Sequence, residues 1–267
     1  MSVLKLPYVF LGSAPIGPIA LEALNHAQYP PVAVIDDPRM TTDELVDQIL
    51  AAKPTFLLVV GFGAILKRDV LDTVAGQVLN IHPSMLPLYR GPAPVVQALL
   101  DGVRETGVSL MEIDTKMDHG PVLAQAAYPL RGNETPAELY EVLTKTGVQL
   151  FLENIDDYLE EKLDLLPQDE SEASVTNMVN KEDARLSFSL PARTLERMTR
   201  AYQGWPRAYV ELDGKRLIID TAHLEVKAFI PDQVQPEGGK TMPFTDFCRG
   251  RRHTPNEVLE DIARQNP

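Results

Sequence analysis

Thiols and long apolar runs are almost missing from this sequence. Its 267 residues include a single cysteine, Cys248, which excludes an intramolecular disulfide and a zinc site built from several thiolates. No apolar stretch approaches the roughly 20 residues that span a bilayer, and the apolar run near the first residue is too short for a signal peptide. We therefore expect a cytosolic protein with no membrane partner, in which Cys248 is a small buried apolar group.

Basic residues are also scarce. The chain carries 25 Lys and Arg against 38 Asp and Glu, a formal net charge of −13. This balance argues against a protein built to coat nucleic acid, because neutralising phosphates needs clustered cations. The acidic excess lies mainly before residue 166. Most of the basic clusters come after it: Arg193, Arg197, Arg200, Arg207, Lys215, Arg216, Arg249, Arg251 and Arg252. A polyanionic partner would have to meet a local basic patch in this second part.

The chain does contain the apolar material of a globular protein. Hydrophobic residues make up 44% and charged residues 24%, and the length allows one large domain or two unequal ones. Strand-like runs occur at 8–13, 31–36, 56–61, 77–82 and 107–114, alternating with helix-like segments at 15–25, 41–53, 65–74, 91–102 and 135–161. This alternation predicts an α/β fold with a doubly wound, mostly parallel sheet, in which ligands bind where the strands end.

Composition changes at residue 166. Residues 166–184 are polar and lack a helical stripe, as in a linker. A helix-like stretch at 191–202 and strand-like runs at 207–212, 215–220 and 223–230 follow, which is typical of a small β-rich domain. We predict an α/β domain at 1–165, a linker at 166–184, a small β-barrel domain at 185–252 and a tail at 253–267. Trp205 is expected in the core of the second domain, with a substrate-facing role as the alternative.

A glycine motif, G-S-A-P-I-G at 12–17, follows the first predicted strand. With Asp36 and Asp37 ending the next strand, it is similar to a dinucleotide fingerprint. Ala14, however, replaces the middle glycine that lets backbone approach a pyrophosphate. We favour a plain strand-to-helix turn with Pro15 at the first helical position, and nucleotide binding stays the alternative.

The run N-I-H-P-S-M-L-P-L-Y-R-G at 80–91 carries the sharper chemical signal. Asn80 and His82 are two residues apart near the end of an apolar strand, so their side chains project from the same face. A carboxamide and an imidazole can together donate hydrogen bonds to an oxyanion, and the imidazole can exchange protons near neutral pH. Asp118, after the next strand, is the candidate carboxylate for this imidazole. The alternative is a structural histidine beside a turn asparagine.

These residues carry a resemblance. NIHPSMLPLYRG and ETGVSLMEIDTKMDHGPVLAQ at 105–125 are similar to the folate-dependent formyltransferases, and the similarity extends over roughly residues 8–252. The resemblance implies transfer of a formyl group from 10-formyltetrahydrofolate to a primary amine. Asn80 and protonated His82 would hold the oxygen of the tetrahedral intermediate, and Asp118 would stabilise the imidazolium and relay a proton. Acyl transfer of this kind needs positioning and oxyanion stabilisation, without a metal.

The same resemblance assigns folate contacts. It places them at Ser84, Met85, Leu86 and Pro87, with a second wall of the pterin pocket at Phe62, Gly63, Ile65 and Leu66. His119 departs from the family, which commonly has a small residue there, and this leaves open which carboxylate partners His82.

The acceptor amine is suggested by the second part of the chain. LPQDESEASVTNMVNKEDARLSF from 166, AYQGWPRAYVELDGKRLIID from 201 and VQPEGGKTMPFTDFCRG from 234 resemble the linker and barrel of the family members that formylate methionyl-tRNA. Initiator methionyl-tRNA, bound through the second domain for translation initiation, is therefore the favoured acceptor, and a monomer is expected. Two departures keep an amino-sugar nucleotide or another small amine open: the acidic charge, and the short segment 37–40 where those members carry a long basic insertion. A folate-binding or RNA-binding protein without turnover is a further alternative.

Overall fold

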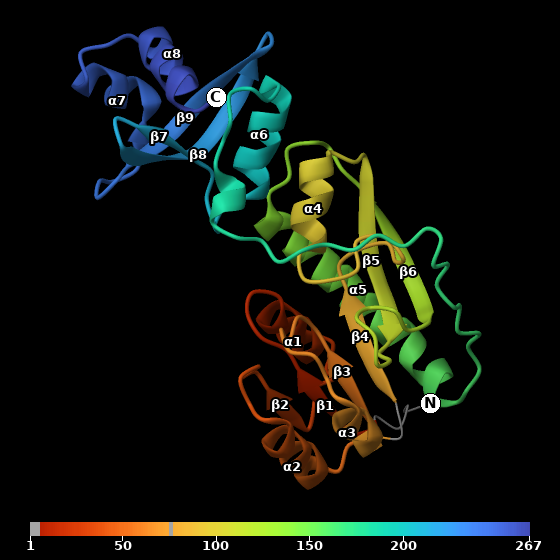
Figure 1. Ribbon diagram of the computed structural model, residues 1–267. Helices are drawn as coiled ribbons and strands as arrows, with labels where there is room; N and C mark the ends of the chain where they lie inside the picture. Colours follow the sequence, from red (N-terminus) through yellow and green to blue (C-terminus); the bar gives the residue numbers. More distant parts are fainter. Residues whose placement is uncertain (1–5, 75–76) are drawn as a thin grey trace. The chain divides into compact units, whose positions relative to one another are not determined.

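The computed structural model describes residues 6–74 and 77–267, which divide into two compact units (Figure 1). The first unit comprises the residues up to Val95, Arg104–Leu130 and Glu138–Asn177, and the second comprises Val96–Val103, Arg131–Ala137 and Met178–Pro267. Neither unit is one continuous stretch of chain. The domain boundaries at 165 and 184 stay a prediction.

Among the described residues, six strands form the sheet of the first unit, in the order β2-β1-β3-β4-β5-β6. The strands are β1 (Tyr8–Leu11), β2 (Ala33–Ile35), β3 (Phe56–Val59), β4 (Val78–His82), β5 (Glu105–Glu112) and β6 (Val122–Pro129). The first four in sequence pair in parallel, whereas β5 runs antiparallel to β4 and β6 antiparallel to β5. The predicted α/β fold with a mostly parallel sheet is confirmed, and β5 and β6 make the sheet mixed. The strand β6, which the sequence pattern did not indicate, extends it at the β5 edge.

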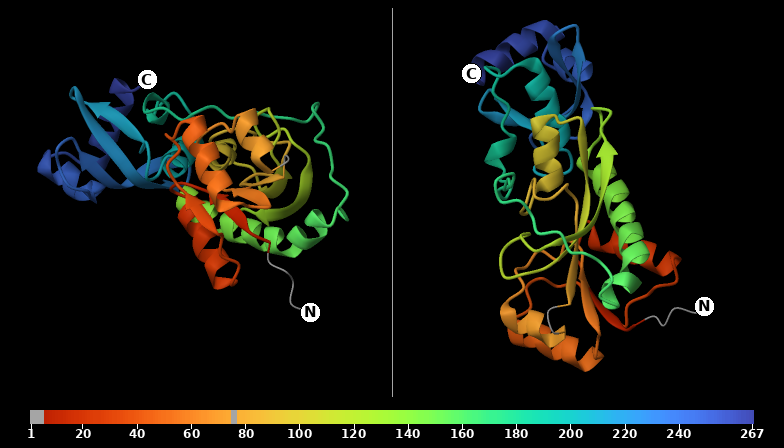
Figure 2. Two further views of the ribbon diagram at one scale, coloured as in Figure 1. Left: turned by 90° about the horizontal axis from the view of Figure 1, so that it is seen from below. Right: turned by 90° about the vertical axis from the view of Figure 1, so that its right-hand side faces the viewer.

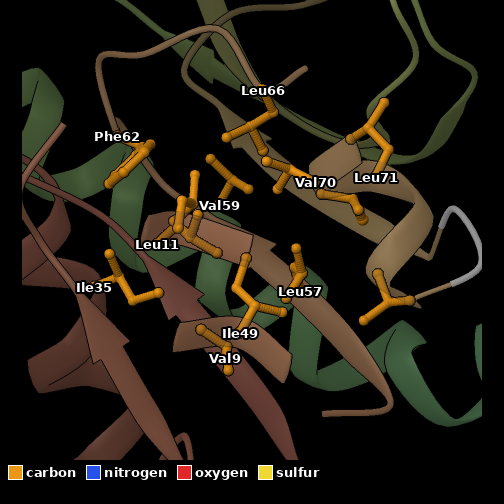
Figure 3. Packing of buried hydrophobic residues seen from close by; sticks show 13 residues of the cluster. Val9, Leu11, Ile35, Ile49, Leu57, Val59, Phe62, Leu66, Val70 and Leu71 are labelled. Carbon is orange, nitrogen blue, oxygen red and sulfur yellow. The ribbon is translucent and has the colours of Figure 1, made fainter. Parts of the chain in front are cut away.

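Helices cover both faces of this sheet. They are α1 (Gly17–His26), α2 (Thr42–Ala52), α3 (Arg68–Leu71) and α5 (Pro136–Leu159). Most of a further helix, α4 (Pro94–Asp101), belongs to the second unit. On one face, Leu45 and Ile49 of α2 join the apolar cluster over Val9, Leu57 and neighbouring strand residues (Figure 3). Helix α5 lies along the other face (Figure 2). Its Phe151 packs against Tyr8 and Phe56 in an aromatic cluster. The sheet core is therefore closed on both sides, and chemistry is left to the strand ends.

Helix α2 shows how local sequence sets an element's start. The Thr41 hydroxyl accepts a hydrogen bond from Glu44 N, while the Glu44 carboxylate accepts one from Thr41 N at 2.8 Å. This capping box satisfies two backbone N–H groups that the first helical turn leaves unpaired. The predicted start at residues 41–44 is confirmed.

The glycine motif at 12–17 forms a tight strand-to-helix turn. A Cβ on Gly17 would lie 2.5 Å from the backbone carbon of Gly12, so this glycine permits close backbone packing. Gly12 N donates to Ile35 O at 3.0 Å, and the Ser13 hydroxyl donates to Gly61 O at 2.8 Å. The placement of Pro15 at the first helical position is wrong, because α1 begins at Gly17 with Pro18 as its second residue. Packing accounts for this motif without a nucleotide.

In the second unit, four of the described strands form an antiparallel sheet in the order β10-β9-β8-β7. They are β7 (Tyr209–Leu212), β8 (Lys215–Glu225), β9 (Ala228–Pro236) and β10 (Met242–Pro243), accompanied by α6 (Ala192–Ala201), α7 (Phe244–Gly250) and α8 (Pro255–Gln265). The prediction of a separate small β-rich part is confirmed. Cys248 lies in its apolar cluster at 1% exposure, as expected.

Three details of this unit differ from the sequence pattern. The predicted strand at 223–230 is wrong, because β8 ends at Glu225 and pairs across a turn with Ala228. Val226 lies in that turn with φ 58°, a conformation that usually takes glycine. The sequence therefore has no glycine or proline to mark the turn. Trp205 is 57% exposed rather than in the core. Residues 255–265 form α8, and its Val258 and Ile262 are buried in the apolar cluster of the unit. None of the described helices is both long and apolar enough to span a bilayer.

Candidate active site

Asn80 and His82 lie in strand β4, and His82 is its last residue. The strand lies inside the sheet between β3 and β5. Asn80 pairs with Met111 of β5, and His82 pairs with Ser109 two residues along. The spacing of two puts both side chains on the same face of the sheet. They are 8% and 5% exposed, so both polar groups are largely withdrawn from water and need partners.

Asp118 supplies those partners from the loop between β5 and β6. Its Oδ1 lies 3.5 Å from Nδ2 of Asn80, and its Oδ2 lies 3.7 Å from Nδ1 of His82. The three side chains that the sequence singled out therefore converge on one place at the strand end. The structure places a carboxylate within ion-pair distance of the imidazole, and the same carboxylate accepts from the carboxamide.

Backbone groups of residues 89–91 complete this arrangement. The other ring nitrogen of His82, Nε2, lies 3.1 Å from Tyr89 O, and Gly91 N donates to Asp118 Oδ2 at 2.8 Å. Sequence reasoning did not single out Tyr89 or Gly91 individually, because their contributions are main-chain atoms and leave no side-chain signal. Gly91 has φ 106°, and a Cβ there would lie 2.8 Å from Thr176 O, so the position requires glycine.

His119, which departs from the family pattern, does not join the three side chains. Its Nδ1 lies 2.5 Å from Asp114 Oδ2, and its Nε2 lies 3.4 Å from Glu170 Oε1. The two imidazoles thus have different carboxylates: Asp114 and Glu170 face His119, and Asp118 faces His82. This resolves which carboxylate lies beside His82.

Residues 84–87, the first predicted folate segment, form a compact turn after β4. The Ser84 hydroxyl donates to Leu88 O at 2.7 Å, and Ser84 O accepts from the Ser109 hydroxyl at 2.7 Å. Leu86 N donates to the same Ser109 hydroxyl at 3.0 Å. Ser84 and Leu86 are buried, whereas Met85 and Pro87 are partly exposed. The turn is thus fixed to β5 and keeps part of its apolar surface accessible next to His82.

The second predicted wall divides into two groups. Phe62 and Leu66 are 3% and 7% exposed and belong to the apolar core, so they anchor the segment after β3 to that core. Ile65 is 78% exposed, and Gly63 is also exposed. Of the predicted apolar side chains after β3, Ile65 is therefore the accessible one. A surface hollow elsewhere, lined by Pro18, Leu21, Glu22, Asn25 and His26 of α1, contains none of these residues.

Two protein-family models match this chain. The formyl transferase family model matches residues 17–155, which include Asn80, His82 and Asp118. The model of the formyl transferase C-terminal domain matches residues 178–231.

Named relatives give the same result. A methionyl-tRNA formyltransferase of Chloroflexus aggregans (strain MD-66 / DSM 9485) is 42% identical over 205 residues, which are 77% of this chain and 65% of the relative. One from Roseiflexus castenholzii (strain DSM 13941 / HLO8) is 37% identical over 251 residues, 83% of this chain and 80% of the relative. The chain therefore spans about two thirds of the length of the first of these proteins and more of the second.

Solved structures share the fold at lower identity. HypX from Aquifex aeolicus in complex with tetrahydrofolic acid has a TM-score of 0.74 at 18% identity, covering 91% of this chain and 47% of HypX. Methionyl-tRNA formyltransferase from Clostridium thermocellum has 0.67 at 18%, covering 86% and 99%. An N-formyltransferase from Helicobacter canadensis, in complex with folinic acid and dTDP-3-aminofucose, has 0.61 at 19%, covering 84% and 97%. At these identities the structures establish the fold alone. With the family model matching residues 17–155 and the relatives' identities, the chain belongs to the formyl transferase family.

Proposed function

We propose that the protein transfers a formyl group from 10-formyltetrahydrofolate to the amino group of initiator methionyl-tRNA. The observation that carries this proposal is the convergence of Asn80, His82 and Asp118 at the end of β4. The names of the relatives in this family support the choice of acceptor. We place the activity in the cytosol and expect the protein to act as a monomer.

The donor would supply an activated formyl carbon beside His82. When the acceptor amine attacks this carbon, negative charge develops on the formyl oxygen, and catalysis requires donors preorganised around that oxygen. Asn80 has a second Nδ2 hydrogen besides the one directed at Asp118, and it can donate this hydrogen to the oxygen. Protonated His82 would be the second donor through Nδ1, which lies 3.7 Å from Asp118 Oδ2, beyond hydrogen-bond distance, whereas Nε2 faces Tyr89 O.

Asp118 would have two roles in this reaction. Beside the His82 ring its negative charge stabilises the imidazolium that serves as oxyanion donor. It would also accept, directly or through a water molecule, the proton that the attacking amine loses as the new C–N bond forms. That proton is then available to the folate nitrogen as the old C–N bond breaks, so the charges balance. The hydrogen bond from Gly91 N fixes Oδ2 for these roles.

The folate would lie against residues 84–87 and Ile65. The turn at 84–87 offers the partly exposed apolar surface of Met85 and Pro87 beside His82, and Ile65 offers an exposed apolar side chain. Apolar walls of this kind suit a flat heteroaromatic ring, since ligand pockets are mostly apolar with a few polar groups that fix orientation. Ser84 and Leu86 would act by holding the turn in shape rather than through exposed side chains.

The tRNA would rely on basic residues of the second unit. Arg193, Lys215, Arg216 and Arg252 are exposed there, and Arg249, also exposed, is paired with Asp246. Arg216 lies over the Tyr209 ring at 3.9 Å, which keeps its guanidinium at the surface. These side chains could neutralise phosphates despite the acidic charge of the whole chain.

One observation favours a small amine as a second candidate acceptor. The segment 37–40 stands where tRNA-acting members carry a basic insertion, and its Arg39 is bound to Asp37, with Nε 2.8 Å from Oδ1. The hydrogen bonds from Arg39 lower the pKa of Asp37 to about 2, and the paired carboxylate offsets the charge of the arginine. An amino-sugar nucleotide, as in the Helicobacter canadensis structure, would not need a basic reach at this position.

A parallel assay separates these functions. The purified protein is incubated with 10-formyltetrahydrofolate and either initiator methionyl-tRNA or amino-sugar nucleotides, and formylated product is measured. Formylation of the tRNA supports the proposal, and formylation confined to the sugars overturns the acceptor. His82→Ala is expected to abolish transfer while folate binding stays near that of the unaltered protein. Folate binding without turnover on any amine would favour the non-catalytic alternative.

A further inference from the structure

The segment 166–177, predicted as a linker, is built into the first unit. Leu166 forms an isolated antiparallel bridge with Val122 of β6, and Val175 forms a parallel bridge with Arg90. Between these two anchors the segment passes over the Asp118 loop and the turn at 89–91. We call residues 166–177 the strap. Its contacts reach the partners of both proposed catalytic side chains, His82 and Asp118.

The first group of contacts holds the turn at 89–91. Tyr89 N donates to the Ser174 hydroxyl, and Arg90 N donates to Ser174 O, both at 2.8 Å. Thr176 N in turn donates to Arg90 O at 2.7 Å. Arg90 N shares a peptide group with Tyr89 O, which faces His82. Arg90 O shares a peptide group with Gly91 N, which binds Asp118.

The second group of contacts centres on Gln168. Its Nε2 donates to Asp118 O at 2.9 Å and to Gly120 O at 2.8 Å, while its Oε1 accepts from Arg90 Nε at 2.9 Å. Both the nitrogen and the oxygen of the Gln168 amide are therefore hydrogen-bonded. Two carbonyls face the nitrogen and a guanidinium faces the oxygen, so only one orientation of the amide satisfies all three neighbours.

Asp118 needs such support because its backbone is strained. Its φ is 47°, in the left-handed region that side chains other than glycine adopt at a cost of about 1–3 kcal/mol unless the surroundings hold them there. Holding Asp118 O and Gly120 O together fixes the peptide groups between residues 118 and 119 and between residues 120 and 121. The direction in which the Asp118 carboxylate leaves the chain follows from that backbone.

Arg90 anchors the amide from the other side. Its side chain is 8% exposed, and its Nη2 lies 2.7 Å from Glu170 Oε1. The hydrogen bonds from Arg90 lower the pKa of Glu170, so this carboxylate stays charged near neutral pH. Gln168 therefore bridges a buried, ion-paired guanidinium to the loop that carries Asp118.

We propose that Gln168 is a positioning residue, which holds the Asp118 carboxylate against Asn80 and His82 by donating two hydrogen bonds to the loop at 118–120. The contacts themselves are independent of any reaction. Their importance for turnover rests on the proposed formyl transfer, in which a displacement of about 1 Å can lower the rate about 100-fold.

Two substitutions in the full chain test this proposal. Gln168→Met keeps the length of the side chain and removes both donors and the acceptor. Gln168→Glu keeps an acceptor for Arg90 and cannot donate to the two carbonyls. We expect both variants to lower kcat about 10- to 100-fold, with KM for 10-formyltetrahydrofolate changed less than about 3-fold. Glu172→Gln, an exposed change in the same strap, is the matched control and should leave kcat unchanged.

Two further readouts separate positioning from folding and from the proposed function. Thermal unfolding of all three variants should stay within a few degrees of the unaltered protein. The ring-nitrogen NMR signals of His82, recorded at one pH without substrate, should shift in Gln168→Met and not in Glu172→Gln.

The outcomes are distinguishable. If the unaltered protein formylates no amine, the proposed function fails, and the His82 signals still decide the positioning role. If the protein is active and either Gln168 variant retains full kcat, the positioning role is wrong. A fall in kcat matched by a large loss of thermal stability would show a general structural role and also overturn it.

Discussion

Oδ2 of Asp118 lies 3.7 Å from Nδ1 of His82, although the two residues come from a loop after β5 and from the end of β4. The neighbouring His119 is drawn to Asp114 instead, at 2.5 Å. Two adjacent residues of one loop, Asp118 and His119, therefore belong to different ion pairs. The pair of Asp118 and His82 lies beside Asn80. Because His119 has a different carboxylate, each pair can be removed by substitution without removing the other.

Asp118→Asn should lower kcat for formyl transfer at least about 100-fold, because the amide cannot stabilise the imidazolium or accept the amine proton. KM for the folate should change little, since Asp118 is not among the proposed folate contacts. Steady-state kinetics with varied folate measure both values. Asp114→Asn, in the same loop and paired with His119, is the control and should retain most of the activity. Near-normal turnover in Asp118→Asn would show that the carboxylate has been assigned wrongly.

Gly91→Ala should destabilise the first unit by more than the roughly 1–3 kcal/mol of backbone strain alone. The added Cβ would meet Thr176 O at 2.8 Å, and φ is 106°. Gly132→Ala, in the second unit, provides a comparison matched in backbone angle, because φ there is 92° and no heavy atom lies within 4 Å of the added Cβ. Urea unfolding of both variants gives the two free energies. Equal losses of unfolding free energy in the two variants would mean that the chain around Thr176 moves away from the added Cβ without a cost in stability.

The Glu134 carboxylate should make the stability of the second unit depend on pH. Burial would raise its pKa, yet hydrogen bonds from backbone N–H groups, including those of Arg131 and Gly132, outweigh burial and lower the pKa from 4.5. The stabilisation is therefore complete above the unfolded value of 4.5 and is lost as pH falls through the lower folded pKa.

Glu134→Gln tests this pH dependence. The variant should be less stable than the unaltered protein near neutral pH, and the difference should shrink between about pH 5 and about pH 2. Urea unfolding at several pH values measures it. A difference that stays constant through this range would assign the effect to packing rather than to charge.

Lys215→Ala combined with Arg252→Ala should raise KM for methionyl-tRNA several-fold without changing kcat. Both side chains are exposed, and each lost phosphate contact should reduce the salt dependence of tRNA affinity by about one unit of log–log slope. Lys145→Ala, on α5 and paired with Glu141, removes a comparable charge from the first unit and serves as control. If the double variant keeps both its KM and its salt slope, the basic surface does not bind the tRNA.

The sequence predicted those parts of the fold in which pattern and environment agree. The apolar run that became β3 is buried on both faces, and the Thr41 capping box marks the start of α2. By contrast, β6 contains three alanines and is buried only at Val122, so it gives a weak apolar signal. The turn between β8 and β9 was missed because Val226 continues the strand-like composition across it.

For the site, the sequence indicated the side chains that could take part in the chemistry. It did not indicate the groups that hold those side chains in place. The pattern of Asn80 and His82 on one strand, with Asp118 after the next, led to three side chains that the structure brings together. Their catalytic roles stay a prediction. Tyr89 O and Gly91 N are main-chain atoms that any residue carries. Gln168 lies in a polar segment without a motif, and only the folded chain brings it to Asp118.

The strap also fixes an order of events during synthesis. A growing polypeptide that has left the ribosome only as far as residue 165 already contains Asn80, His82 and Asp118, but the buried Arg90 still lacks Gln168 and Glu170. The proposed reaction centre would mature only once the strap through Thr176 has emerged and docked. A shortened version intended to retain the chemistry should therefore end after Asn177, where the first unit ends, and not at the compositional break before it.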